Sequence, residues 1–148
     1  MLDVDCIKAE KIALRLIARA EQSIAGLTAK LEKRGIDPSL ARYVISRLLE
    51  KNLLDDTRYA ERWISAHLKM KKPLSPLWFL VSLEKRGVNR EICLAAINKV
   101  LDEETEYSLL LKYIDGMDVL TKETVPVRTK LRREGFSPEA INKYTDSE

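Results

Sequence analysis

The sequence predicts an all-α protein built from tandem three-helix modules, and three observations support this fold class. Apolar residues recur at three- and four-residue intervals, and no stretch alternates long enough to indicate a strand. A helix-ending motif occurs three times in the 148 residues. Aromatic residues make up only 6% of the chain, and Gly and Pro number five each, which argues against a β-sandwich with many tight turns. We expect the modules to share buried surface in an elongated stack, whose curvature the sequence leaves open.

The repeated motif predicts a helix–turn–helix corner. Residues 31–36 (LEKRGI) recur as residues 83–88 (LEKRGV) and more loosely as residues 131–136 (LRREGF). Basic residues suit the C-terminal end of a helix, and the glycine then takes the left-handed position that follows it. Two residues later comes a side chain that can cap the next helix, followed by proline in two cases. The repeat therefore assigns structural roles to the glycines and caps, namely Gly35, Gly87, Gly135, Asp37, Asn89 and Ser137.

The first module is predicted to span residues 1–54. Its first helix carries an apolar stripe with helical spacing, and Ser23 is a candidate cap for the second helix. The third helix follows Pro38 and has the clearest apolar stripe in the chain. The residues of the three stripes are Ala13, Leu16, Ile17, Ala20 and Ile24; Ile24, Leu27 and Leu31; and Leu40, Ala41, Val44, Ile45, Leu48 and Leu49.

The second module is predicted at residues 55–101. Its helices begin near Asp55, at Ser75 and after Asn89. Their apolar faces contain Tyr59, Ala60, Trp63, Ile64 and His67; Phe79 and Leu83; and Ile92, Cys93, Ala96, Ile97 and Val100.

A third, atypical module is predicted at residues 102–148, where Pro126 limits the middle helix to a short one that begins near residues 124–126. The face of its first helix is assigned to Tyr107, Leu110, Leu111 and Ile114, that of the short helix to Val127 and Leu131, and that of the last to Ala140, Ile141 and Tyr144. Residues 101–106 and 115–124 are rich in Asp, Glu, Thr and Gly, so we expect flexible joints there.

Catalytic chemistry finds little support in the sequence. The single histidine, His67, lies on an apolar helix face and is expected to be structural and half-buried. Cys6 and Cys93 form no CxxC pair, and Cys93 is expected to be a buried thiol. The acidic pairs at residues 55–56 and 103–104 lie at predicted helix starts, where carboxylates cap backbone amides. We predict no catalytic residue, no metal site and no cofactor.

The charge distribution predicts a binding surface in the second module. Residues 1–101 hold 19 Lys and Arg against 12 Asp and Glu, whereas residues 102–148 hold 7 against 11. A basic surface can contact phosphates or an acidic protein groove, although a solvated helix face has the same composition. The basic stripe of the first helix, Lys8, Lys11, Arg15 and Arg19, is interpreted as such a solvated face. The candidate binding residues are Arg58, Arg62, Lys69, Lys71, Lys72, Lys85, Arg86 and Arg90.

The second module also has more apolar bulk than the shared core positions require. Trp78, Leu80 and Val81 stand where the first module has Gly26, Thr28 and Ala29. These three residues either cover a seam between modules or form an exposed patch for a partner. Base stacking by Trp78 would require neighbouring aromatic residues on an accessible face.

Residues 53–61 (LLDDTRYAE), together with the three glycine corners, resemble the RecX family of recombination regulators. The resemblance extends from about Ala13 to Tyr144. It implies a small all-helical protein of tandem three-helix modules that binds the RecA recombinase in the groove of its filament on single-stranded DNA. There it would limit filament growth and inhibit strand exchange, ATPase and coprotease activities, without being an enzyme. The chain departs from the family where basic positions of the second module have become apolar, at residues 75–80.

The resemblance places the protein in DNA repair, recombination and the SOS response, with a RecA-type filament and its single-stranded DNA as partners. The absence of an apolar stretch of membrane-spanning length and of a visible secretory signal predicts a cytoplasmic protein, and we expect a monomer. Two alternatives stay open. One is a helix-turn-helix DNA-binding protein whose reading helix follows Pro38 and carries Arg42, Arg47 and Lys51. The other is a helical-repeat adaptor that uses the Trp78 region and needs no nucleic acid.

Overall fold

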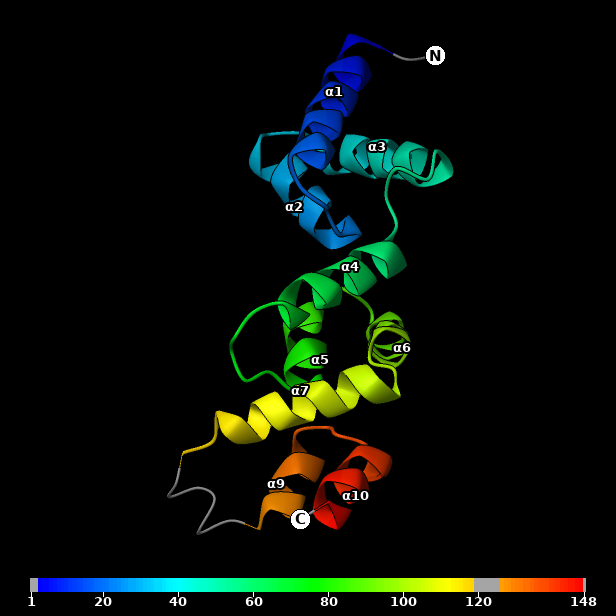
Figure 1. Cartoon of the computed structure of the whole chain (residues 1–148). Helices are drawn as coiled ribbons and strands as arrows, with labels where there is room; N and C mark the ends of the chain where they lie inside the picture. The colour runs from blue at the N-terminus through cyan, green and yellow to red at the C-terminus, as the bar shows by residue number, and fades with distance from the viewer. Residues whose placement is uncertain (1–2, 119–125, 148) are drawn as a thin grey trace.

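The computed structural model describes residues 3–118 and 126–147, and within these residues it is helical throughout, with no strand. Figure 1 shows an elongated molecule in which helices are stacked along one direction, with the N-terminus at one end and the C-terminus near the other. The all-α prediction is confirmed. No helix within the described residues is both long and apolar enough to span a membrane.

The first group of helices consists of α1 (Val4–Arg19), α2 (Ile24–Lys33) and α3 (Pro38–Glu50), which pack against one another. Their apolar faces form a separate core that includes Ala13, Leu27, Leu31 and Leu48, all fully buried. Helix α1 ends at Arg19, so Ala20 and Ile24 do not extend its stripe as predicted; Gln22 and Ser23 are buried in the turn and Ile24 begins α2.

The second group consists of α4 (Asp56–Leu68), α5 (Pro76–Lys85) and α6 (Arg90–Val100). The third consists of α7 (Glu103–Asp115), α9 (Val127–Arg133) and α10 (Pro138–Asp146). One continuous apolar core runs through both groups and joins Phe79 and Leu83 of α5 to Leu110 of α7 and Leu131 of α9. The module boundaries proposed after residues 54 and 101 stay a prediction.

The glycine corners adopt the expected geometry. Gly35, Gly87 and Gly135 have φ angles of 87°, 86° and 90°, which a residue with a Cβ adopts only at a cost. Each helix that follows is capped by a side-chain oxygen: Asp37 accepts a hydrogen bond from the Ser39 amide, Asn89 from the Glu91 amide and Ser137 from the Ala140 amide. Asn52, with φ 58°, provides the corresponding turn after α3.

Two predictions for the third module are wrong. Residues 101–106 are not a flexible joint, because Leu101 is buried, Asp102 caps α7 and Glu103–Glu106 form its first turn. The buried face of α7 uses Leu109 and Leu110, and Leu111 is 42% exposed, because the helix is rotated by one position from the predicted stripe. Helix α9 begins at Val127 with Pro126 as its N-cap, and residue 124 lies outside the described residues.

Candidate functional site

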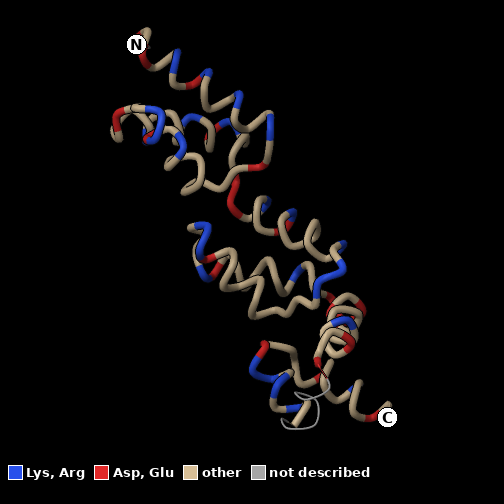
Figure 2. The backbone as a smooth tube through the Cα atoms, turned by 90° about the vertical axis from the view of Figure 1, so that its left-hand side faces the viewer, with Lys and Arg blue, Asp and Glu red and all other residues tan. Residues whose placement is uncertain are grey.

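The eight basic residues predicted for binding lie on α4, in the connection between α4 and α5, at the end of α5 and at the start of α6. In Figure 2 the Lys and Arg positions are distributed along the whole molecule, with Asp and Glu positions between them. Three of the eight pair with acidic side chains. Arg58 and Arg62 both approach Glu21, in the turn before α2, and Arg90 pairs with Glu84 at 3.3 Å. These three charges are partly neutralised within the protein.

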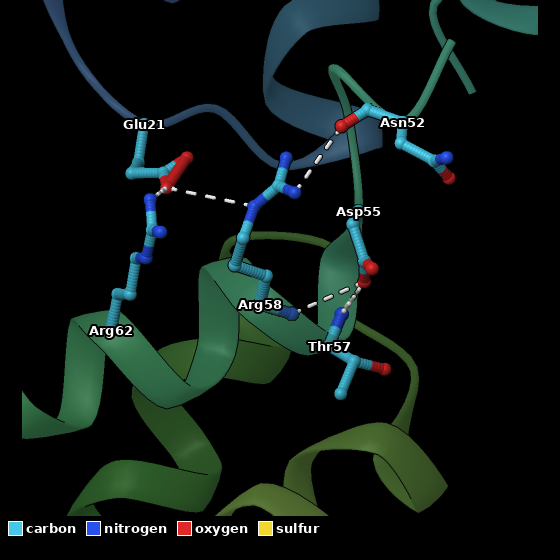
Figure 3. A network of polar contacts seen from close by, with 6 residues as sticks. All are labelled: Glu21, Asn52, Asp55, Thr57, Arg58 and Arg62. Atoms are coloured by element: carbon cyan, nitrogen blue, oxygen red, sulfur yellow. Dashed lines mark hydrogen bonds and ion pairs between the residues drawn. The ribbon is translucent and has the colours of Figure 1, made fainter. Parts of the chain in front are cut away.

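Figure 3 shows how the Glu21 contacts connect the first group of helices to the second. The Arg58 guanidinium donates a hydrogen bond to the Asn52 carbonyl at 3.2 Å and lies 3.9 Å from the Glu21 carboxylate. Asp55 caps α4 by accepting hydrogen bonds from the backbone amides of Thr57 and Arg58, and the Arg58 side chain extends between Glu21 and Asn52. The first two residues of the predicted binding set therefore take part in an internal joint.

The remaining five basic residues of that set are exposed. Lys69, Lys71 and Lys72 lie in the connection between α4 and α5, and none has an ion pair among the residues that the structure describes. Lys85 ends α5, and Arg86 follows it with its guanidinium 5.2 Å from the centre of the Trp63 ring. These cations remain available to an external anion.

Lys85 and Arg86 line a shallow depression whose other lining residues are three aromatic side chains and Ser82. Its six lining residues are Trp63, His67, Trp78, Ser82, Lys85 and Arg86. Trp63 and Trp78 stack with ring centroids 5.5 Å apart and an interplanar angle of 17°. His67 lies 3.9 Å from Trp63, ring centroid to ring centroid, and its Nδ1 donates to the Trp63 carbonyl at 2.8 Å, since a carbonyl only accepts. We call these six residues the indole site.

The predicted apolar patch is divided by the structure. Leu80 is 7% exposed and belongs to the core shared by the second and third groups, whereas Trp78 and Val81 are 37% and 41% exposed. The sequence interpretation missed Trp63 and Ser82 as surface residues beside Trp78. Trp63 and His67 are four residues apart and so share a helix face, but their contact with Trp78 depends on how α4 and α5 pack.

The structure also shows the surroundings of His67, of Cys93 and of the basic residues at and just after the end of α3. His67 is half-buried and Cys93 is buried, where desolvation raises the pKa of its thiol. On α3, the proposed reading helix of a helix-turn-helix protein, Arg47 and the following Lys51 both pair with Glu10 of α1. Within residues 3–118 and 126–147, no three His, Cys, Asp or Glu side chains cluster as metal ligands would.

Comparisons with known proteins agree on one family. Residues 9–48 match the family model described as RecX, first three-helix domain. The regulatory protein RecX of Treponema pallidum is 31% identical over 138 residues, which cover 93% of this chain and 75% of that protein. The regulatory protein RecX of Pseudomonas fluorescens is 26% identical over 140 residues, covering 93% and 89%.

Solved structures support the same fold. The crystal structure of RecX from Lactobacillus salivarius superimposes with a TM-score of 0.75 at 20% sequence identity, covering 99% of this chain and 97% of that one. A second crystal structure, of a regulatory protein RecX, gives a TM-score of 0.73 at 16% identity and covers 97% of this chain and 72% of that one. At these identities the likeness concerns the fold.

Proposed function

Because this chain belongs to the RecX family of regulatory proteins, we propose that it binds the filament that a RecA-type recombinase forms on single-stranded DNA, and that it limits filament growth. Bound there, it inhibits strand exchange and the ATPase and coprotease activities of the filament. The protein acts by binding alone, and the Lys and Arg side chains of the second group meet acidic groove walls or DNA phosphates.

The observation that carries the proposal is the elongated row of helix groups (Figure 1). A long, narrow body can contact several protomers of a filament at once, so that modest individual contacts combine into one multivalent attachment. Spanning neighbouring protomers opposes the movements that ATP turnover and strand exchange require.

The structure changes which basic residues should carry this binding. Arg58, Arg62 and Arg90 are engaged by internal carboxylates, so a partner would have to displace those carboxylates to use them. Lys69, Lys71 and Lys72 have no such competitor among the described residues and are exposed. We therefore assign the principal electrostatic contact to these three lysines, followed by Lys85 and Arg86.

The test compares two triple charge reversals. Lys69→Glu, Lys71→Glu and Lys72→Glu together should weaken filament binding by tenfold or more, because several charge-assisted contacts are reversed at once. The matched control is Lys8→Glu, Lys11→Glu and Arg15→Glu on α1, which makes the same change of charge on the stripe interpreted as solvated.

Binding is measured by capture on recombinase filaments formed with and without nucleotide, across a salt series, and inhibition is measured as loss of filament ATPase. We expect the first variant to lose both binding and inhibition and the control to keep them. Wild-type inhibition by the first variant, or equal losses in both variants, would contradict the assignment of this contact.

A further inference from the structure

The indole site combines an exposed aromatic ring with cations, and its position on the second group of helices leaves it open to solvent. Trp78 is 37% exposed, although it is a large aromatic side chain of a helix whose next residue, Phe79, is fully buried. A bulky aromatic ring at the surface indicates a binding role, because burying the ring in the core would stabilise the protein more.

The packing around Trp78 fixes its orientation. Trp63 stacks on it, His67 lies 5.6 Å away and Phe79 meets it edge to face at 5.5 Å, all measured between ring centroids. Its helix is fixed as well, since the Trp78 amide donates to the Oγ of Ser75, the N-cap of α5. An aromatic ring held this firmly loses little conformational entropy when a flat ligand stacks on it.

The charges at the indole site select between kinds of ligand. None of its six lining residues is acidic, whereas Lys85 and Arg86 contribute two positive charges. Two stacked indoles could also hold a cation by cation–π attraction, but these two neighbours would repel it. A purely apolar partner would gain no binding energy from the charges of Lys85 and Arg86. A ligand with flat aromatic rings and negative charges satisfies both parts of the site.

We propose that the indole site binds single-stranded DNA, with a nucleobase stacked on Trp78 and adjacent phosphates contacted by Lys85 and Arg86. Stacking of bases on aromatic side chains, next to a basic track, is how single strands are held without base-specific hydrogen bonds. The inference rests on the proposed function for its choice of ligand, and it adds a direct contact with the DNA strand. Trp63 and His67 serve as positioning residues behind Trp78.

Trp63 and Trp78 are the only tryptophans in the sequence, so tryptophan fluorescence, excited selectively over that of the five tyrosines, reports on the indole site alone. Titration of the full chain with an oligodeoxythymidylate, in the absence of recombinase, should quench this fluorescence. An abasic oligonucleotide of the same length offers the phosphates without the bases and should bind more weakly and quench less. Equal quenching by the two would show binding through phosphates only and would overturn the proposal.

Three substitutions separate stacking from other effects. Trp78→Leu keeps an apolar side chain but removes the aromatic face, and should lower the affinity for the oligonucleotide between about fivefold and a hundredfold. Trp78→Phe keeps a stacking face and should retain most of the affinity. Leu94→Ala, a control at an exposed aliphatic residue of α6 in the same group of helices, should change nothing. Retained affinity in Trp78→Leu, or equal losses in the Phe and Leu variants, would refute base stacking.

The same variants distinguish this inference from the proposed function. If the proposed function is correct and stacking is wrong, Trp78→Leu will bind the free oligonucleotide like the wild type while the wild-type chain inhibits the filament. If Trp78→Leu loses filament binding but keeps its affinity for the oligonucleotide, the indole site binds the recombinase itself, and the DNA assignment is wrong. Quenching of the wild-type chain without any inhibition of the filament would support stacking and count against the proposed function.

Discussion

The molecule has two joints, one between the first and second groups of helices and one between the second and third. Equivalent residues make contact at both joints, but the interactions around those contacts differ. In each, the N-cap serine of a second helix reaches the glycine corner of the next group. The Ser23 hydroxyl donates to the Arg86 carbonyl, and the Ser75 hydroxyl donates to the Glu134 carboxylate. The same relation connects two different pairs of groups because the modules repeat.

What surrounds these contacts differs. At the first joint the neighbouring interactions are polar: Glu21 with Arg58 and Arg62, and the Ile24 amide with the Asp56 carboxylate at 2.7 Å. At the second joint a continuous apolar core passes from one group into the next. Equivalent turns can therefore yield one joint held mainly by polar contacts and another held mainly by hydrophobic burial, and the two joints should differ in their resistance to opening.

We expect the greatest loss of stability from truncating a buried side chain, either in the core of the first group or in the core shared by the second and third groups. Leu27→Ala in the first core and Leu131→Ala in the shared core remove matched, fully buried leucines, and each should cost about 2–5 kcal/mol of unfolding free energy. Hydrogen exchange should show lost protection in α1–α3 alone for Leu27→Ala, and in both the second and third groups for Leu131→Ala. Loss of protection throughout the molecule in Leu27→Ala would mean that the two cores unfold as one.

Alanine at Gly87 should produce the next largest effect. Residue 87 has a φ of 86°, which strains any residue with a Cβ. In addition, a Cβ at this position would lie 2.3 Å from the Ala25 Cβ across the first joint. Strain costs about 1–2 kcal/mol, and forcing the two groups apart adds to it. Gly35→Ala is the matched control, because it has the same φ but no atom within 4 Å, so it should show the strain alone.

The difference between the losses of unfolding free energy in the two glycine variants, measured by urea denaturation, gives the cost of the close contact between residue 87 and Ala25. Combining Gly87→Ala with Ala25→Gly should recover part of that difference. Equal losses for Gly35→Ala and Gly87→Ala would show that the first joint opens without cost.

A smaller effect is expected from the ion pairs of the first joint. Arg62→Gln removes the closer partner of Glu21, but Arg62 is 64% exposed, so the loss of stability should be less than about 1 kcal/mol. Amide exchange in the turn before α2 should nevertheless quicken. Arg90→Gln, which breaks the similarly exposed pair with Glu84 inside the second group, should leave that turn unchanged.

The smallest predicted effect is a pH dependence at the same joint. Burial raises the pKa of Asp56, the neighbouring Asp55 carboxylate acts in the same direction, and the hydrogen bond from the Ile24 amide opposes them. A folded-state pKa above the unfolded value means that the folded protein binds more protons, so stability falls as the pH rises through that interval. Asp56→Asn keeps a hydrogen-bond acceptor for the Ile24 amide but cannot titrate. In this variant the urea midpoint should depend less on pH over that interval. An unchanged pH dependence would show that another group causes it.

Much of the fold could be predicted from the sequence because its signals are local. A glycine two residues before Asp37 or Asn89 defines a corner within six residues, and apolar spacing defines the helix face that follows. The flexible joint predicted at residues 101–106 is wrong because two local signals compete there: the composition indicates a loop, but the acidic pair at 103–104 also predicts the helix start that the structure has. On α7 three consecutive leucines left the buried pair ambiguous by one position.

The candidate site was less predictable because it depends on contacts between distant residues. Glu21 and Arg62 are 41 residues apart, so the sequence does not reveal that the Glu21 carboxylate pairs with both Arg58 and Arg62. Trp63 and Trp78 lie on different helices, and only the packing of α4 against α5 brings their rings together. The exposure of Lys69, Lys71 and Lys72 could be expected from the sequence, because several cations close together in a connection between helices favour solvent; their role in binding stays a prediction.

The glycine corners of the second and third groups also lie at the contacts between adjacent groups. At the first joint the corner rests against Ala25, and at the second it rests against Pro76 and the backbone of Leu77, the residue equivalent to Ala25. A larger side chain at either contact would have to push the adjacent groups apart. Substitutions at these two points would therefore change the spacing between neighbouring groups while leaving the helices themselves intact.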